Sequence, residues 1–119
     1  MKAIESYKDL IVWQKSMDLV ELIYRVTEGL PARERWGLSD QMRRAAVSIP
    51  SNIAEGYGRQ SSGNYKQFLA TGRGSLFELE TQLYICIRLN YIKQNEIEKI
   101  LDKIVEIGKM LSSLISKIH

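Results

Sequence analysis

The chain has 119 residues, a single cysteine and a formal net charge of +3. This length can bury roughly two-thirds of the surface that the unfolded chain exposes, so one domain needs no disulfide or metal to be stable. The lone Cys86 excludes an internal disulfide, and its apolar neighbours indicate a buried structural side chain.

Export and membrane insertion are both disfavoured by the sequence. The amino-terminal segment, Met1 to Leu10, is polar and mixed in charge. The longest apolar run, Leu83 to Ile87, is far too short for a signal-peptide core or a membrane span. We therefore expect a single domain over residues 1–119, located in the reducing cytoplasm.

The first helix is predicted from about Ser6 to Glu28, where apolar residues recur at spacings of three and four in two neighbouring stripes. One stripe consists of Leu10, Trp13, Met17, Val20, Tyr24 and Thr27, and the other of Val12, Leu19, Ile23 and Val26. Together they form an apolar arc wide enough for a bundle interior or for a partner chain. Gly29 and Pro31 are predicted to end the helix, the glycine as a left-handed cap.

The second helix is predicted from Leu38 to Tyr57, with Ser39 or Asp40 as its cap. Its apolar phase continues across Pro50, although a proline inside a helix removes a hydrogen bond and costs about 3 kcal/mol. We therefore favour one helix kinked at Pro50 over two separate helices. Polar neighbours such as Asn52 are placed to satisfy the backbone groups that the kink releases.

The third helix is predicted to begin after Ser61 or Ser62 and to bury one apolar face. That face consists of Tyr65, Leu69, Gly72, Leu76, Leu79, Leu83 and Ile87. Gly72 and Gly74 lie in the middle of this helix, where each glycine costs about 1 kcal/mol relative to alanine. A neighbouring backbone is therefore expected to pass close to them.

The fourth helix follows a turn over Asn90 to Asn95 and is apolar over a wide arc. Its inward stripe is Ile97, Leu101, Ile104, Gly108, Leu111, Ile115 and Ile118, beside Ile100, Ile107 and Leu114. Helices joined by short connectors must lie antiparallel to their sequence neighbours. The sequence therefore predicts an all-α fold, an antiparallel up-down-up-down four-helix bundle.

The pattern lacks the residues that catalysis or metal binding would need. The only histidine is His119, the last residue, so the inward Glu-x-x-His pairs of a di-iron bundle cannot be built. Without a histidine base, Cys86 and the serines have no activating partner. The Gly-Arg-Gly-Ser run at residues 72–75 lacks the spacing of a phosphate loop. We expect no enzyme activity, no metal and no cofactor.

Positive charge is concentrated in the middle of the chain. Residues 33–73 hold seven Lys or Arg against three Asp or Glu, which leaves +4 there and −1 elsewhere. Helical geometry puts Arg44 on the outer face of the second helix and Arg43 on its flank. On the third helix, Lys66 and Arg73 share one flank with aromatic residues. Such a surface suits nucleic acid, through phosphate pairing and base stacking. The competing interpretation is ion pairing within helices, such as Asp40 with Arg44.

Three segments carry a family resemblance: Asp9 to Lys15 (DLIVWQK), Arg43 to Arg59 (RRAAVSIPSNIAEGYGR) and Gly74 to Leu83 (GSLFELETQL). They resemble the bacterial four-helix bundle family, also named for the proteins encoded by intervening sequences in 23S ribosomal RNA genes. The resemblance implies a bundle that assembles into a homopentamer. It also implies kinship with the accessory protein of diversity-generating retroelements, whose basic pentamer engages nucleic acid and a reverse transcriptase.

Two classes of function follow from charge and resemblance together. The first is a non-enzymatic homo-oligomer that binds RNA or DNA with little sequence preference, as an adaptor for a nucleic-acid enzyme such as a reverse transcriptase. Its candidate contacts are Arg43, Arg44, Arg59, Lys66 and Arg73, of which the first three occupy basic positions in the family's central motif. The second class is a protein-binding scaffold whose basic residues are incidental.

Self-association is expected from the residues themselves. The first and fourth helices are apolar over more arc than an isolated bundle can cover, and Ile85 and Leu89 point away from the inward stripe of the third helix.

Overall fold

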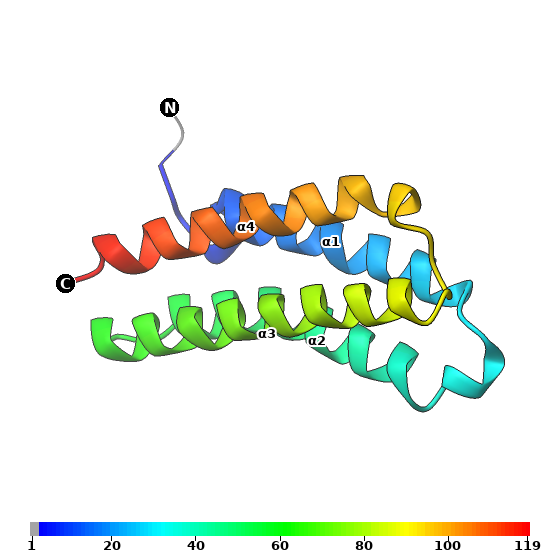
Figure 1. Ribbon diagram of the computed structural model, residues 1–119. Coiled ribbons are helices and arrows are strands. Elements are labelled where there is room, and N and C mark those ends of the chain that lie inside the picture. Colours follow the sequence, from blue (N-terminus) through cyan, green and yellow to red (C-terminus); the bar gives the residue numbers. More distant parts are fainter. Residues whose placement is uncertain (1–2) are drawn as a thin grey trace.

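The computed structural model describes residues 3–119, so Met1 and Lys2 of the predicted domain lie outside the described part. Its long helices are α1 Ile11–Glu28, α2 Leu38–Tyr57, α3 Ser62–Arg88 and α4 Glu98–Lys117. Short 3-10 turns precede three of them: η1 Tyr7–Asp9, η2 Ala32–Glu34 and η3 Gln94–Glu96. Each long helix runs antiparallel to the next, which confirms the predicted up-down-up-down bundle (Figure 1).

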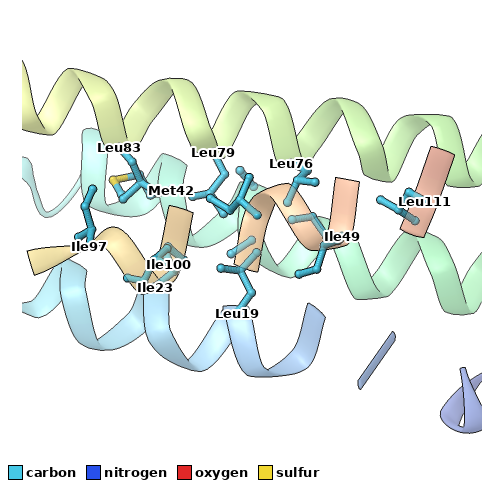
Figure 2. Packing of buried hydrophobic residues seen from close by; sticks show 14 of the residues in the cluster. Leu19, Ile23, Met42, Ile49, Leu76, Leu79, Leu83, Ile97, Ile100 and Leu111 are labelled. Carbon is cyan, nitrogen blue, oxygen red and sulfur yellow. The ribbon is translucent and has the colours of Figure 1, made fainter. Parts of the chain in front are cut away.

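The four helices form a closed cycle of contacts. Helix α1 packs against α2 and α4, and α3 packs against the same two helices, with the α2–α3 pair the most extensive. Every helix contributes to one hydrophobic core, and the side chains drawn in Figure 2 meet along its axis. They include Leu19, Ile23, Met42, Ile49, Leu76, Leu79, Leu83, Ile100 and Leu111. Burying each such side chain stabilises the fold by about 1.5 to 3 kcal/mol.

The core-facing side of α1 carries most of the second predicted stripe together with Thr27 of the first. Val12, Leu19 and Ile23 are buried, and Ser16 and Thr27 complete the face by donating to carbonyls of their own helix. Met17 and Tyr24 of the first stripe are instead 42% and 40% exposed. The wide apolar arc of α1 is therefore divided between the core and an outer surface.

The predicted first boundary was wrong by five residues. Ser6 caps the short η1 turn by accepting from the Lys8 amide at 3.1 Å, and Leu10 is then extended, with φ −72° and ψ 123°. Helix α1 therefore begins at Ile11. At its other end, Gly29 has φ −82°, so the predicted left-handed cap is also wrong.

The start of α2 differs from the sequence prediction as well. Gly37 is its N-cap residue, and neither Ser39 nor Asp40 makes a capping bond. Instead, a carboxylate oxygen of Glu34 accepts from the Leu38 amide at 3.2 Å. At α3, by contrast, the predicted Ser61 cap is confirmed, because its hydroxyl accepts from the Asn64 amide at 3.2 Å.

Helix α2 continues without interruption through Pro50, which confirms a single helix there. The Asn52 side-chain amide donates to the Ser48 carbonyl at 2.8 Å and to the Ser48 hydroxyl at 2.9 Å. The Ser48 hydroxyl in turn contacts that of Ser75 at 2.8 Å. These bonds satisfy polar groups beside the proline and join α2 to α3.

Two glycines lie where α2 packs on α3, and at one of them, Gly56, a side chain would not fit. An ideal Cβ on Gly72 would lie 3.5 Å from the Ile49 carbonyl oxygen, so the α2 backbone does pass close to α3, as predicted. An ideal Cβ on Gly56 would lie 2.7 Å from the Phe68 Cβ. Gly74 meets nothing within 4 Å and has no such role.

Candidate nucleic-acid interface

The bundle has two ends, and most of the candidate basic side chains lie nearer to one of them than to the other. One end, called the η2 end here, consists of the 29–37 connection and the 89–97 turn. The opposite end carries the 58–61 turn, the start of α1 and the carboxyl-terminal end of α4 (Figure 1). No helix among residues 3–119 has the length and hydrophobicity to cross a membrane.

Arg43 lies on the flank of α2 that faces α1. Its Nε donates to the Thr27 hydroxyl at 2.8 Å, and its Nη2 donates to the Tyr24 carbonyl at 3.3 Å. The guanidinium also lies over the Tyr24 ring, 4.7 Å from the centroid. Arg43 therefore links the end of α1 to α2, while no carboxylate of residues 3–119 lies within ion-pair distance of its guanidinium.

Arg44 points outward, as the helical geometry predicts, with a side chain that is 79% exposed. Its Nε lies 2.9 Å from a carboxylate oxygen of Asp40. The ion-paired interpretation of this residue is thus confirmed. An exposed pair of this kind is worth little, and the arginine remains accessible to a phosphate.

Arg59 and Lys66 lie toward the opposite end of the bundle. Arg59 pairs with Glu55 at 2.6 Å and lies over the Phe68 ring, 4.9 Å from its centroid. Lys66 is exposed near the start of α3. From Arg44 to the end of α2 the separation is about 20 Å along the helix, so these residues and the arginines of the η2 end form separate groups.

Arg73 lies on the α4 side of α3, where its Nη1 donates to the Ser112 hydroxyl at 3.1 Å. Because Arg43 faces α1, these two predicted contacts lie on different sides of the α2–α3 pair. Within one chain, the five predicted residues do not form a continuous basic patch. Neighbouring copies of the chain would be needed to bring the groups together.

Two further arginines of the basic segment 33–73 lie at the η2 end and are not among the candidate contacts predicted from the sequence. Arg33 lies 5.5 Å from the centroid of the Tyr91 ring, and Arg35 is exposed. With Arg43 and Arg44 they place four arginines near one end of the bundle. The run Arg33-Glu34-Arg35 is the sequence signal that could have identified them. Their closeness to Arg43 depends on how the connection between α1 and α2 folds.

The acidic side chains of the same segment are occupied. Glu34 accepts from the Tyr91 hydroxyl at 2.8 Å and from the Leu38 amide. These bonds, aided by the nearby Arg33 charge, lower the pKa of Glu34 despite some desolvation. Asp40 and Glu55 pair with their own arginines. Most of the basic charge of residues 33–73 is therefore not neutralised by a bound carboxylate.

Two exposed apolar surfaces lie on opposite sides of the bundle. The α1–α2 surface is a shallow groove of about 310 Å³ that includes Trp13, Met17, Val47 and Pro50. The α3–α4 surface is a groove of about 430 Å³ that includes Phe77, Val105 and Gly108. Phe77 is 52% exposed and Val105 is 49% exposed. Ile85 and Leu89 are also exposed, as predicted, at 40% and 51%.

The groups most relevant to catalysis do not converge. Over residues 3–119, no three His, Cys, Asp or Glu side chains are grouped so that they could hold a metal ion. Burial raises the pKa of the Cys86 thiol to about 11, with a smaller contribution from the Glu34 charge. At neutral pH this thiol is protonated, and its sulfur lies 3.7 Å from that of Met42.

The chain is similar in fold to a solved crystal structure. That structure is from Bacteroides thetaiotaomicron VPI-5482 and is described as a protein with unknown function from the S23 ribosomal protein family. It is 29% identical to this chain, with a TM-score of 0.82, and the match covers 88% of this chain and 98% of that one. None of the curated proteins compared with the chain matches it.

A family match agrees with this likeness and with the resemblance of the central segment. The family model of the 23S rRNA-intervening sequence proteins matches the chain over residues 8–113, which includes all four long helices except the last turn of α4. The chain belongs to the 23S rRNA-intervening sequence protein family.

Proposed function

We propose that this protein is a non-enzymatic homo-oligomer that binds RNA or DNA through the basic residues of segment 33–73. The observation that carries the proposal is the charge balance of that segment. Among the described residues, its three carboxylates are all occupied, while five basic side chains have no carboxylate within ion-pair distance. These five are Arg33, Arg35, Arg43, Lys66 and Arg73. Unneutralised arginine is suited to phosphate because its planar fork donates two hydrogen bonds at once.

Self-association would unite basic groups that one chain holds apart. The α1–α2 and α3–α4 surfaces lie on opposite sides, so contact between unlike surfaces of successive copies would be head-to-tail. Such contacts close into a ring when the rotation per copy allows it, and the family resemblance suggests five copies. A ring would repeat Arg43, Arg44, Arg59, Lys66 and Arg73 once per subunit. Weak phosphate contacts would then act together along one strand.

The names of the similar proteins are consistent with an RNA partner. The family is named for intervening sequences of 23S rRNA, and the similar structure is assigned to an S23 ribosomal protein family. Within this proposal the protein acts in the cytoplasm as an adaptor that presents nucleic acid to another enzyme, such as a reverse transcriptase. Contacts to phosphates alone would give little sequence preference.

The test is a titration of the chain with structured RNA and with duplex DNA at low and at physiological salt. Binding through several phosphates should weaken steeply as salt rises. The informative variants are Arg33→Ala/Arg35→Ala at the η2 end and Arg59→Ala/Lys66→Ala at the opposite end, which each remove two charges. Each pair should lower the salt slope by about 2 if its residues contact phosphate.

Absence of salt-sensitive binding by the wild-type chain to either nucleic acid would reject the proposal. The protein-binding scaffold, supported by the two exposed apolar surfaces, would then replace it. Light scattering on every variant should give the wild-type mass, so that a loss of binding is not a loss of assembly.

A further inference from the structure

A polar pocket of about 450 Å³ lies at the η2 end, between the end of α1 and the start of α2. Its polar lining comes from Thr27, Glu28, Arg35, Ser39 and Arg43. Two guanidinium groups therefore face one carboxylate, which leaves the lining with a net charge of +1. The volume is within the range of small-ligand sites, about 300 to 1,000 Å³.

Ser39 is the first sign that the pocket takes a ligand. The residue is only 7% exposed, and its hydroxyl makes no hydrogen bond to any residue from 3 to 119. Among residues 3–119 only Gln82 Oε1 is a side-chain polar atom both sealed from solvent and without a partner, so the Ser39 hydroxyl oxygen still meets solvent and is open to a ligand. Since Ser39 lines the pocket, its unpartnered hydroxyl can donate to or accept from a ligand there.

The two arginines are the second sign. The bonds of Arg43 to Thr27 and to the Tyr24 carbonyl use one Nε–H and one Nη2–H, which fixes the guanidinium plane. Three of its five N–H groups remain available. The Arg35 guanidinium has no ion-pair or hydrogen-bond partner among the described residues. A prepositioned arginine beside an adaptable one suits an anion with several oxygen atoms.

The start of α2 is a third feature that favours binding of an anion in this pocket. Ser39 is the second residue of this 20-residue helix, whose first turn has backbone amides without intrahelical partners. The positive end of the helix dipole also points there, which favours a bound anion. Glu28 is the one carboxylate of the lining, and Asp40 nearby is paired with Arg44. The Glu34 carboxylate keeps its charge but lies outside the lining, bonded to the Tyr91 hydroxyl and the Leu38 amide.

We propose that this pocket binds the phosphate group of a nucleotide. Arg35, Arg43 and Ser39 hold the phosphate oxygens, and the pocket volume leaves room for the attached sugar. Trp36 follows Arg35 in the sequence and is 84% exposed, so an aromatic face is available near the pocket for a base to stack on. The nucleotide can be free or can be the phosphorylated end of a strand, because both present the same group.

The direct probe is adenosine 5′-monophosphate, titrated against the full chain by calorimetry and by NMR of backbone amides. Binding should shift the amide resonances of Ser39 and its neighbours, whereas adenosine, which lacks the phosphate, should not. Arg35→Ala should weaken binding about tenfold or more, and Ser39→Ala about threefold. The matched control is Lys117→Ala, which removes one exposed positive charge at the end of α4, at the opposite end of the bundle, and should leave the affinity unchanged.

Strand ends are tested with a short oligoadenylate that carries either a 5′-phosphate or a 5′-hydroxyl. Preferential binding of the phosphorylated form identifies a strand end as a ligand, and binding of the mononucleotide alone identifies a free nucleotide. If neither phosphate compound shifts Ser39, or if Lys117→Ala weakens binding as much as Arg35→Ala, the pocket is not a phosphate site. The mononucleotide assay is independent of assembly on long RNA or DNA, so this proposal and the proposed function can fail separately.

Discussion

The Tyr91 hydroxyl donates a 2.8 Å hydrogen bond to the Glu34 carboxylate, across 57 positions of sequence. The other oxygen of that carboxylate accepts from the Leu38 amide at the start of α2. One acidic side chain therefore caps a helix and joins the two connections at the η2 end. This arrangement holds the segment that carries Arg33 and Arg35 against the bundle.

Tyr91→Phe should lower the free energy of unfolding at pH 7 by removing this bond. Because the bonds lower the Glu34 pKa below its ordinary value of 4.5, their contribution is present above that pH. It is lost as the pH falls through the lower folded-state pKa. Urea unfolding at pH 7 and near pH 3 should show a difference between wild type and variant that shrinks in acid. Tyr84→Phe, at an exposed residue, is the control; a loss as large as that of Tyr91→Phe would contradict the assignment.

Gly56→Ala should destabilise the bundle by about 1 to 3 kcal/mol, because the new Cβ would overlap the Phe68 Cβ at 2.7 Å. Neither atom is the end of a flexible side chain, so α2 and α3 would have to move apart. Gly74→Ala makes the same chemical change in open space and should stabilise α3 by about 0.5 to 1 kcal/mol. Changes of the same sign in chemical denaturation would refute this account.

Arg43→Ala should cost about 1 to 2 kcal/mol of stability, because it breaks bonds to Thr27 and to the Tyr24 carbonyl. Arg44→Ala removes the same charge from an exposed ion pair and should change stability by less than about 0.5 kcal/mol. Thermal unfolding of the two variants distinguishes them. Equal effects would show that Arg43 does not link α1 to α2 in solution.

The chain should self-associate at micromolar concentration through the α1–α2 and α3–α4 surfaces. Light scattering should then give a mass well above the 13.7 kDa of one chain. Val47→Glu and Val105→Glu each place a charge on one surface, and either change alone should lower the mass if unlike surfaces meet. Gln41→Glu, at an exposed polar position of α2, is the control.

A wild-type mass near 13.7 kDa would reject self-association altogether. A larger mass that differs from five chains would reject only the pentamer.

The fold followed from the sequence because helix periodicity and short connectors leave few arrangements. The stripe of α3 from Leu69 to Leu83 is buried as predicted, and α2 continues through Pro50 with its apolar phase intact. These features depend on residues within about two helical turns of one another, whose positions on a helix are set by local geometry. The three segments that carry the family resemblance imply the same four-helix bundle.

The helix ends and the choice of stripe were decided by tertiary contacts. Both stripes of α1 satisfy the same periodicity, and only packing against α2 and α4 selects Leu19 and Ile23 for the core over Met17 and Tyr24. Likewise, Glu34 rather than Ser39 accepts from the first amide of α2, because the η2 turn brings its carboxylate there. Capping rules consider only residues next to the helix start, so they do not predict a Glu34 carboxylate that Tyr91 holds in place from the other connection.

By itself the sequence determined a helical bundle with positive charge over residues 33–73 and without a histidine where catalysis could use one. Only the tertiary structure decided how that charge is distributed. It separates Arg59 and Lys66 from Arg43 and Arg44, and it brings Arg35 to the pocket beside Arg43. The physical reason is that charges along a chain are ordered by sequence, whereas the field that a ligand meets depends on distances across helices and turns.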